Sequence, residues 1–133
     1  MNIFKRIDHV EIIPMDVQAT LRFYTEVLGF QISSRNPIAL PPLKEVIYLR
    51  LGDGVVEIMV VDSPGKAPDD PWIGGYRAIA IEVEDMAEAV KYLTAKGVAI
   101  ARQPVDLGDS YRAEIRDPDG LAIELRQWKK PGR

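Results

Sequence analysis

One pattern occurs twice along the chain, and it constrains the fold more than any single motif does. In each copy an apolar run leads through an aspartate into a helical pattern that ends at a glycine. The marker positions are His9, Asp16 and Gly29 in the first copy, and Ala78, Asp85 and Gly97 in the second. The first interval is seven positions in both copies, whereas the second is thirteen positions in one and twelve in the other. This self-similarity predicts two modules of the same topology.

The residues at the two helix ends agree with this interpretation. Asp16 and Asp85 are of the type that caps a helix N-terminus, because a short carboxylate accepts hydrogen bonds from the free N–H groups of the first turn. Glu88, three positions after Asp85, completes a pattern like a capping box. Gly29 and Gly97 suit the left-handed conformation that ends many helices. We therefore expect one helix in each module, beginning after the aspartate and ending before the glycine.

Strand-like runs follow each helix. They are FQISS, VIYLRL and VVEIMVV in the first module, and VAIAR, YRAEIR and LAIELRQW in the second. Asp53-Gly54 and the segment Asp117-Pro118-Asp119-Gly120 provide turns between the last two runs of each module. The expected order is strand–helix–strand–strand–strand, twice, which is an α+β fold of two βαβββ modules.

The boundaries of these modules can be placed from composition. We expect one domain over residues 1–133, with module 1 at about 7–61, a linker at 62–75 and module 2 at about 76–128. The linker DSPGKAPDDPWIGG holds three prolines and three glycines, which favours an irregular surface segment. The stretch NPIALPPLK, residues 36–44, is also expected to be irregular and to form a flap near a site.

Composition excludes several classes of function. The chain has 133 residues, of which 47% are hydrophobic and 28% charged, as in ordinary soluble domains. It contains no cysteine, so disulfides, zinc–thiolate sites and thiol nucleophiles are excluded, and we expect a cytoplasmic protein. No apolar run approaches the length of a membrane span. The net charge is −3 and there is no basic stripe, so neither a membrane nor a nucleic acid is an expected partner.

A histidine and two glutamates are the candidate chemical groups. His9 is the single histidine, and in the run IDHVEII it shares a strand face with Glu11. Glu57 and Glu124 each lie in the middle of the last strand of a module, among apolar neighbours. A carboxylate there is costly to bury unless it is paired or binds a metal, so a divalent ion held by imidazole and carboxylates is one hypothesis. The other is a histidine that is only hydrogen-bonded and glutamates that meet water or arginine.

Five segments resemble the vicinal oxygen chelate superfamily: IDHVEI, FYTEVLGF, VVEIMV, AIAIEVED and RDPDGLAIEL. This superfamily includes glyoxalase I, fosfomycin-resistance and bleomycin-resistance proteins, methylmalonyl-CoA epimerase and extradiol dioxygenases. The resemblance covers about residues 7–127. It implies two βαβββ modules whose mixed sheets form a cup, a homodimer and a small-molecule ligand. It also implies that the metal ligands are His9, Glu57 and Glu124.

The fourth ligand position departs from the family pattern. Metal-binding relatives often have a histidine where this chain has Ala78, and no second histidine is available. Dioxygenase and fosfomycin-type sites need two histidines and are therefore less favoured. The resemblance implies instead a lyase or isomerase that acts by metal-assisted proton transfer next to a carbonyl, with Glu57 or Glu124 as ligand or base. Its cofactor would be one divalent ion: Mn²⁺, Mg²⁺, Ni²⁺ or Zn²⁺, with preference for the oxygen-seeking Mn²⁺ or Mg²⁺.

Two alternatives remain open. The first is a small-molecule binding protein of the bleomycin-resistance type that has no metal, in which the same residues line a polar pocket. The second is a structural or partner-binding dimer with a vestigial cavity. The candidate substrate-binding residues are Glu11, Arg50, Tyr76, Tyr111 and Arg126. Tyr76 has the strand parity of Ala78 and could supply a phenol oxygen, whereas Arg77 is expected to face the opposite way.

Overall fold

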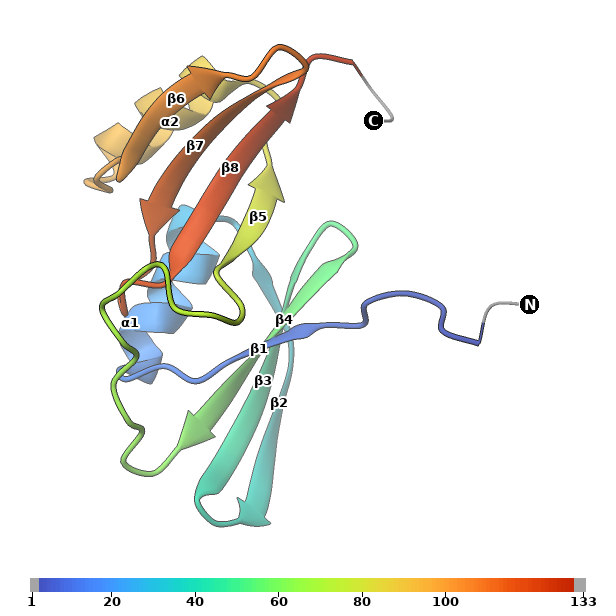
Figure 1. Cartoon of the computed structure of the whole chain (residues 1–133). Coiled ribbons are helices and arrows are strands. Elements are labelled where there is room, and N and C mark those ends of the chain that lie inside the picture. Colours follow the sequence, from blue (N-terminus) through green and yellow to red (C-terminus); the bar gives the residue numbers. More distant parts are fainter. Residues whose placement is uncertain (1–2, 131–133) are drawn as a thin grey trace. The chain divides into compact units, whose positions relative to one another are not determined.

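The computed structural model of the chain describes residues 3–130 and divides into two compact units between Ala67 and Pro68. The first unit contains a short first strand, a helix and three further strands (Figure 1). Its elements are β1 (Val10–Ile12), α1 (Val17–Arg22), the π-helical turn η1 (Phe23–Val27), β2 (Gln31–Leu40), β3 (Leu43–Leu51) and β4 (Gly54–Val61). They form a four-stranded sheet in the order β1-β4-β3-β2, in which β1 pairs with β4 in parallel and the other pairs are antiparallel.

The second unit repeats this topology. Its elements are β5 (Ala78–Glu82), α2 (Met86–Ala95), β6 (Arg102–Asp106), β7 (Ser110–Arg116) and β8 (Ala122–Trp128). The sheet order is β5-β8-β7-β6, and β5 pairs with β8 in parallel. The expected pair of βαβββ modules is thus confirmed. Because the first and last strands of each module are hydrogen-bonded neighbours, a residue near the start of a module lies beside one near its end.

The helix ends are built as the sequence predicts. The carboxylates of Asp16 and Asp85 each accept a hydrogen bond from the backbone N–H three positions on, at 3.1 and 2.9 Å. Such a cap contributes about 1 kcal/mol to helix stability. Gly29 and Gly97 have φ angles of 84° and 81°, the left-handed region that ends both helical segments. None of the helices within residues 3–130 combines the length and apolar character needed to cross a membrane.

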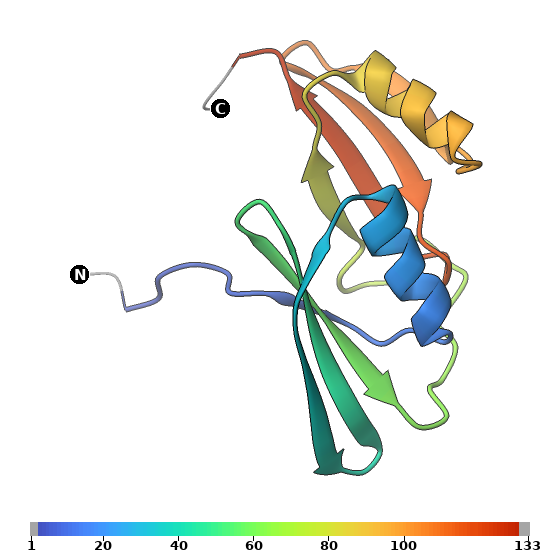
Figure 2. The same ribbon diagram turned by 180° about the vertical axis from the view of Figure 1, so that it is seen from behind.

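Alternation along the strands separates an apolar face from a polar face in the second sheet. The apolar face holds the buried side chains of Ala113, Ile115, Ile123 and Leu125. Helix α2 lies along this sheet, as both views show (Figures 1 and 2). It covers the apolar face, because its first backbone N–H donates to Gln127 Oε1, and Gln127 shares the strand parity of Leu125. The charged residues of β7 and β8 therefore point away from α2.

The first sheet divides in the same way. Ile47, Leu49, Val56 and Ile58 are buried on one face and supply much of the core of this unit. The intervening residues of β3 and β4 place polar side chains on the other face, and Tyr48 on β3 is the register partner of Glu57 on β4. A buried carboxylate is thus positioned opposite the apolar core face, where charged partners can reach it.

Two expectations about the strands are wrong. Residues 36–44 form no irregular flap but continue β2 into β3 as a hairpin, with Pro37 opposite Glu45. The run VAIAR is not a strand, and pairing in β6 begins only at Arg102, opposite Glu114. The prolines of residues 36–44 led to the expectation of an irregular flap. Strand β6 likewise contains a proline, Pro104. Both strands lie at a sheet edge, where a missing N–H donor is tolerated.

Candidate functional site

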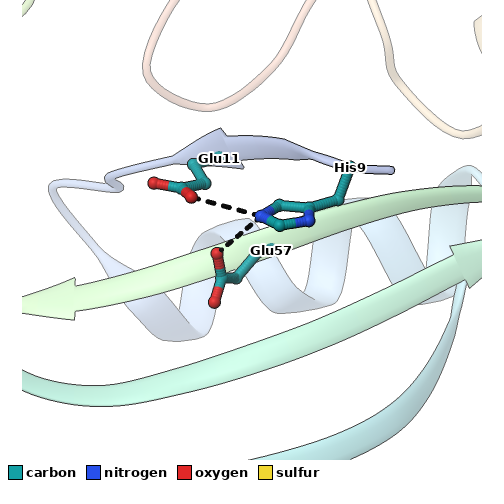
Figure 3. Close-up of side chains that lie close together, drawn as sticks. All are labelled: His9, Glu11 and Glu57. Atoms are coloured by element: carbon teal, nitrogen blue, oxygen red, sulfur yellow. Dashed lines mark hydrogen bonds and ion pairs between the residues drawn. The ribbon is translucent and has the colours of Figure 1, made fainter. Parts of the chain in front are cut away.

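The imidazole of His9 lies between two carboxylates of the first unit. Its Nε2 atom is 3.2 Å from Glu11 Oε2 and 3.2 Å from Glu57 Oε2 (Figure 3). Glu11 on β1 and Glu57 on β4 are partners in the parallel register, and His9 precedes Glu11 by two positions. One potential ligand atom from each residue lies within 4.8 Å of the other two. The expected meeting of His9 and Glu57 is therefore present, with Glu11 as a third member.

The other ring nitrogen of His9 is hydrogen-bonded to Asp8. Its Nδ1 lies 2.8 Å from Asp8 Oδ2, the distance of a charge-assisted hydrogen bond in which the ring N–H donates. A proton on Nδ1 leaves Nε2 with its lone pair directed at two carboxylate oxygens, an arrangement in which three acceptors meet. Such an arrangement is stable only if a cation lies among them, either a proton on Nε2 or a metal ion. A carboxylate behind a metal-binding histidine is a common feature of metal sites.

The surrounding groups shift the pKa values of three side chains in directions that agree with one another. The hydrogen bond to Asp8, and then that to Glu11, raises the pKa of the His9 imidazole above its usual value. The same contact lowers the pKa of the Asp8 carboxyl. The neighbouring Glu57 carboxylate, together with burial, raises the pKa of the Tyr48 hydroxyl, whose ring meets the His9 ring edge-on at 5.9 Å. The site as a whole therefore favours positive charge at its centre.

The residues fit a divalent metal ion. Ligand atoms that share an ion at about 2.0–2.2 Å stand roughly 3 Å apart, close to the two separations of 3.2 Å around Nε2. One nitrogen and two carboxylate oxygens form a ligand set that suits Mn²⁺ or Zn²⁺. Glu57 is buried, so its charge needs a partner, whereas Glu11 is half exposed and leaves one side of the site accessible.

Glu124, the other predicted ligand, lies in the second unit and is held by arginines there. Its Oε1 atom accepts a hydrogen bond from Arg112 Nε at 2.6 Å, and its Oε2 lies 3.0 Å from an Arg126 guanidinium nitrogen. Within residues 3–130, the only group of three or more suitable ligand atoms is that of His9, Glu11 and Glu57. A role of Glu124 as a further ligand or base stays a prediction.

Sequence reasoning missed a second buried carboxylate, Glu114 on β7. It has no exposed surface, and its oxygens lie 2.8–3.8 Å from four guanidinium groups. These belong to Arg77, Arg102, Arg112 and Arg116. Burial raises the pKa of the Glu114 carboxyl, but the arginines outweigh burial and the net shift is downward. The signal was present in YRAEIR, where Arg112, Glu114 and Arg116 alternate on one face of the strand.

The remaining predicted residues are scattered. Arg50 lines a small cavity of about 180 Å³ together with Tyr48 and Asp8. Arg126 belongs to the polar face of the second sheet, but Tyr111 has the opposite strand parity and lies against Lys129, 4.8 Å away. Tyr76 precedes β5 and is fully exposed. The expected opposite orientation of Arg77 is wrong: it lines a pocket with Ala78, because it lies before the strand and its long side chain reaches Glu114.

Comparison with known proteins gives the same family throughout. A family model described as the Glyoxalase/Bleomycin resistance protein/Dioxygenase superfamily matches residues 6–125. The protein YaeR of Escherichia coli K12 is 32% identical over 123 residues, which cover 91% of this chain and 95% of that protein. A lactoylglutathione lyase of Escherichia coli O157:H7 is 33% identical and is covered to 89%, as is this chain. A crystal structure of a glyoxalase family protein from Enterococcus faecalis superposes with a TM-score of 0.79 at 33% identity, covering 92% of this chain and 98% of its own.

Proposed function

The chain belongs to the glyoxalase/bleomycin resistance protein/dioxygenase superfamily, and we propose that it is a metal-dependent lyase or isomerase that moves a proton on a carbon next to a carbonyl group. The observation that supports this proposal is the position of His9 Nε2, which faces Glu11 and Glu57 at 3.2 Å while Asp8 holds Nδ1. An imidazole nitrogen that faces two carboxylates marks a place for a cation. The similarity to a lactoylglutathione lyase favours lyase chemistry over simple binding.

Each residue of the site has a distinct role in this proposal. His9 and Glu57 would hold a divalent ion, and Asp8 fixes the ring of His9 so that Nε2 stays directed at the site. Such an ion would supply Lewis-acid polarisation of the substrate's carbonyl oxygen, which would make the neighbouring carbon more acidic. A glutamate that does not hold the ion would take the proton. Glu124 is the candidate that the family resemblance adds, and Glu11, which is half exposed, is the candidate in the first unit when only His9 and Glu57 hold the ion.

Metal content is the first test. The protein would be freed of metal, offered Mn²⁺, Mg²⁺, Ni²⁺ or Zn²⁺ in turn, and examined by elemental analysis and thermal unfolding. We expect about one ion per chain and a raised melting temperature, because an ion that binds only the folded state stabilises it. His9→Ala and Glu57→Gln should abolish both effects. Glu45→Gln, which neutralises a carboxylate of the same sheet that pairs with Arg35, should leave them intact.

Turnover is the second test. The metal-loaded protein would be assayed with a panel of α-keto thiohemiacetals and acyl-CoA epimers, with Glu57→Gln as the inactive reference. Proton exchange at the carbon next to the carbonyl, followed by NMR in D₂O, reports the proposed step directly. If compounds of this panel shift the melting temperature of the metal-free protein and none is converted, the protein is a metal-free binder and the proposal is wrong.

A further inference from the structure

The second unit has a pocket of about 470 Å³ on the polar side of its sheet. Its lining consists of three arginines, one tryptophan, two alanines and one glutamate: Arg77, Arg102, Arg112, Trp72, Ala78, Ala80 and Glu124. We infer that this pocket binds a small organic oxyanion with two or more negative charges, a phosphate ester or a polycarboxylate. Because Glu124 is also a candidate base of the proposed function, the inference rests on that function and adds the charge of its substrate.

The charges around the pocket do not balance. Arg77, Arg102 and Arg112 line the pocket, and Arg116 and Arg126 belong to the same network of ion pairs. These five arginines pair with two carboxylates, those of Glu114 and Glu124, which leaves the network with an excess of three positive charges. Counting Glu82 as well, the register partner of Arg126 on β5, the excess is still two. Guanidinium groups gathered with too few carboxylates repel one another, and an anion that enters removes this repulsion.

The arginines are held in place before any ligand arrives. Glu114, fully buried beneath them, bonds the guanidinium groups of Arg77 and Arg112 at 2.8 and 3.2 Å. On the outer side, the Trp72 ring lies 5.3 Å from the guanidinium carbon of Arg77 and 5.7 Å from that of Arg102, within the range of cation–π contacts. Groups that are already ordered lose little entropy on binding, so a pre-arranged cluster binds an anion more tightly than mobile side chains do.

Donors remain available to a ligand. Arg102 is the least engaged member of the cluster, since its Nε lies 3.8 Å from Glu114 and its side chain is 48% exposed. The methyl groups of Ala78 and Ala80 leave space beside the guanidinium groups, and planar guanidinium donors match the oxygen pairs of carboxylates and phosphates.

The volume indicates a ligand larger than a lone inorganic ion. Pockets for small organic molecules measure about 300–1,000 Å³, and the pocket of the second unit falls within this range at about 470 Å³. A phosphate or carboxylate group would lie among the arginines, and the organic part would extend along Ala78 and Ala80. Trp72, which is 70% exposed, supplies an apolar wall at the entrance.

Titration calorimetry at constant ionic strength tests the inference with two probes, inorganic phosphate and succinate, and with chloride as the reference anion. We expect saturable binding of at least one probe: phosphate alone would indicate a phosphate ester, and succinate alone a polycarboxylate. Arg102→Gln should weaken binding about ten- to a hundredfold, the effect of removing one charged hydrogen-bonding group. The matched control is Arg35→Gln, which removes an arginine of similar exposure in the first unit (46% against 48%) and should have no effect.

Three further measurements distinguish anion binding in this pocket from binding at the metal centre and from the effects of misfolding. In His9→Ala, binding of the probes should persist, which shows that the anion does not sit on an ion bound to His9. Arg102→Lys, which keeps the charge and loses the planar fork, should bind with intermediate affinity. Circular dichroism would establish that each variant is folded. The inference is overturned if no probe binds at millimolar concentration, or if Arg102→Gln and Arg35→Gln weaken binding equally.

Discussion

Replacement of Glu114 by glutamine preserves the size of the side chain and removes its charge from the centre of the arginine cluster. The carboxylate has no exposed surface, and its two oxygens lie 2.8–3.2 Å from the guanidinium groups of Arg77, Arg112 and Arg116. A glutamine keeps one oxygen as an acceptor for these groups. Its NH₂ group, however, would bring a donor against guanidinium donors at the position of the second oxygen. The variant therefore loses charge pairing and gains a donor–donor conflict.

The expected cost follows from burial and exposure together. Removing one partner of a fully buried ion pair costs about 3–5 kcal/mol, because the other charge is left unpaired. The three arginines are 25–38% exposed, so water replaces part of the lost interaction. We therefore expect the free energy of unfolding to fall by roughly 2–4 kcal/mol. Urea unfolding followed by far-ultraviolet circular dichroism at pH 7 measures this change.

The control for this substitution is Glu45→Gln in the first sheet. Glu45 pairs with Arg35 through two hydrogen bonds of 2.9 and 3.1 Å, but its side chain is 25% exposed. Exposed pairs of this kind contribute about 0–1 kcal/mol. Should Glu114→Gln prove no more destabilising than Glu45→Gln, the buried carboxylate does not organise the cluster and the reasoning is refuted.

Three other properties can be checked directly. Because the pKa of Glu114 is lowered from its usual 4.5, the Glu114 carboxylate stabilises the fold fully above pH 4.5, and this stabilisation is lost as the pH falls through the lowered value. Urea unfolding at decreasing pH should therefore show a smaller loss of unfolding free energy in Glu114→Gln than in the natural chain. The His9 imidazole, whose pKa is raised from 6.5, contributes stability below pH 6.5, and this stability disappears as the pH rises through the raised value. NMR titration of the metal-free proteins should find a lower pKa for His9 in Asp8→Asn than in the natural chain. Gly97 has φ 81° with open space around the position of a Cβ atom, so Gly97→Ala should lower the free energy of unfolding by roughly 1–2 kcal/mol through backbone strain alone, as urea unfolding would show.

The features that follow from local rules were predictable from the sequence. A repeated order of aspartate, helical pattern and glycine predicted both βαβββ modules, since caps and helix ends depend on neighbouring residues only. The approach of His9 to Glu11 was also predictable, because residues two apart on an extended segment share a face. Its approach to Glu57 needed one further element, the pairing of the first and last strands of a module, which the family resemblance supplied.

The missed features depend on partners that are distant in the sequence. Glu114 sits on a strand that was correctly predicted, but its burial depends on arginines from other parts of the second unit, including Arg77 and Arg102. Nothing near Glu114 in the sequence indicates that these arginine side chains converge on it. The hairpin over residues 36–44 was missed for a related reason: the prolines of this stretch would interrupt a central strand, and only the sheet order shows that β2 lies at an edge.

The two sheets place different chemistry at equivalent positions. In the first sheet, Glu57 has Glu11 as its register partner on one side and Tyr48 on the other. In the second sheet, the corresponding partners of Glu124 are Ala80 and Glu114. The same backbone framework thus places a carboxylate, a phenol and an imidazole around one glutamate, and a methyl group and a second carboxylate beside the other.

This difference determines which ion each sheet can receive. Around Glu57, the imidazole of His9 would be a ligand of the proposed ion, which would replace only the proton on Nε2. Beside Glu124, the carboxylate of Glu114 is paired with arginines. The two oxygens of Glu124 itself lie 2.6 Å from Arg112 and 3.0 Å from Arg126. A metal ion at Glu124 would compete with these two guanidinium groups for the carboxylate and would add to an existing excess of positive charge. We therefore expect the polar face of the first sheet to attract a cation and that of the second sheet to attract an anion.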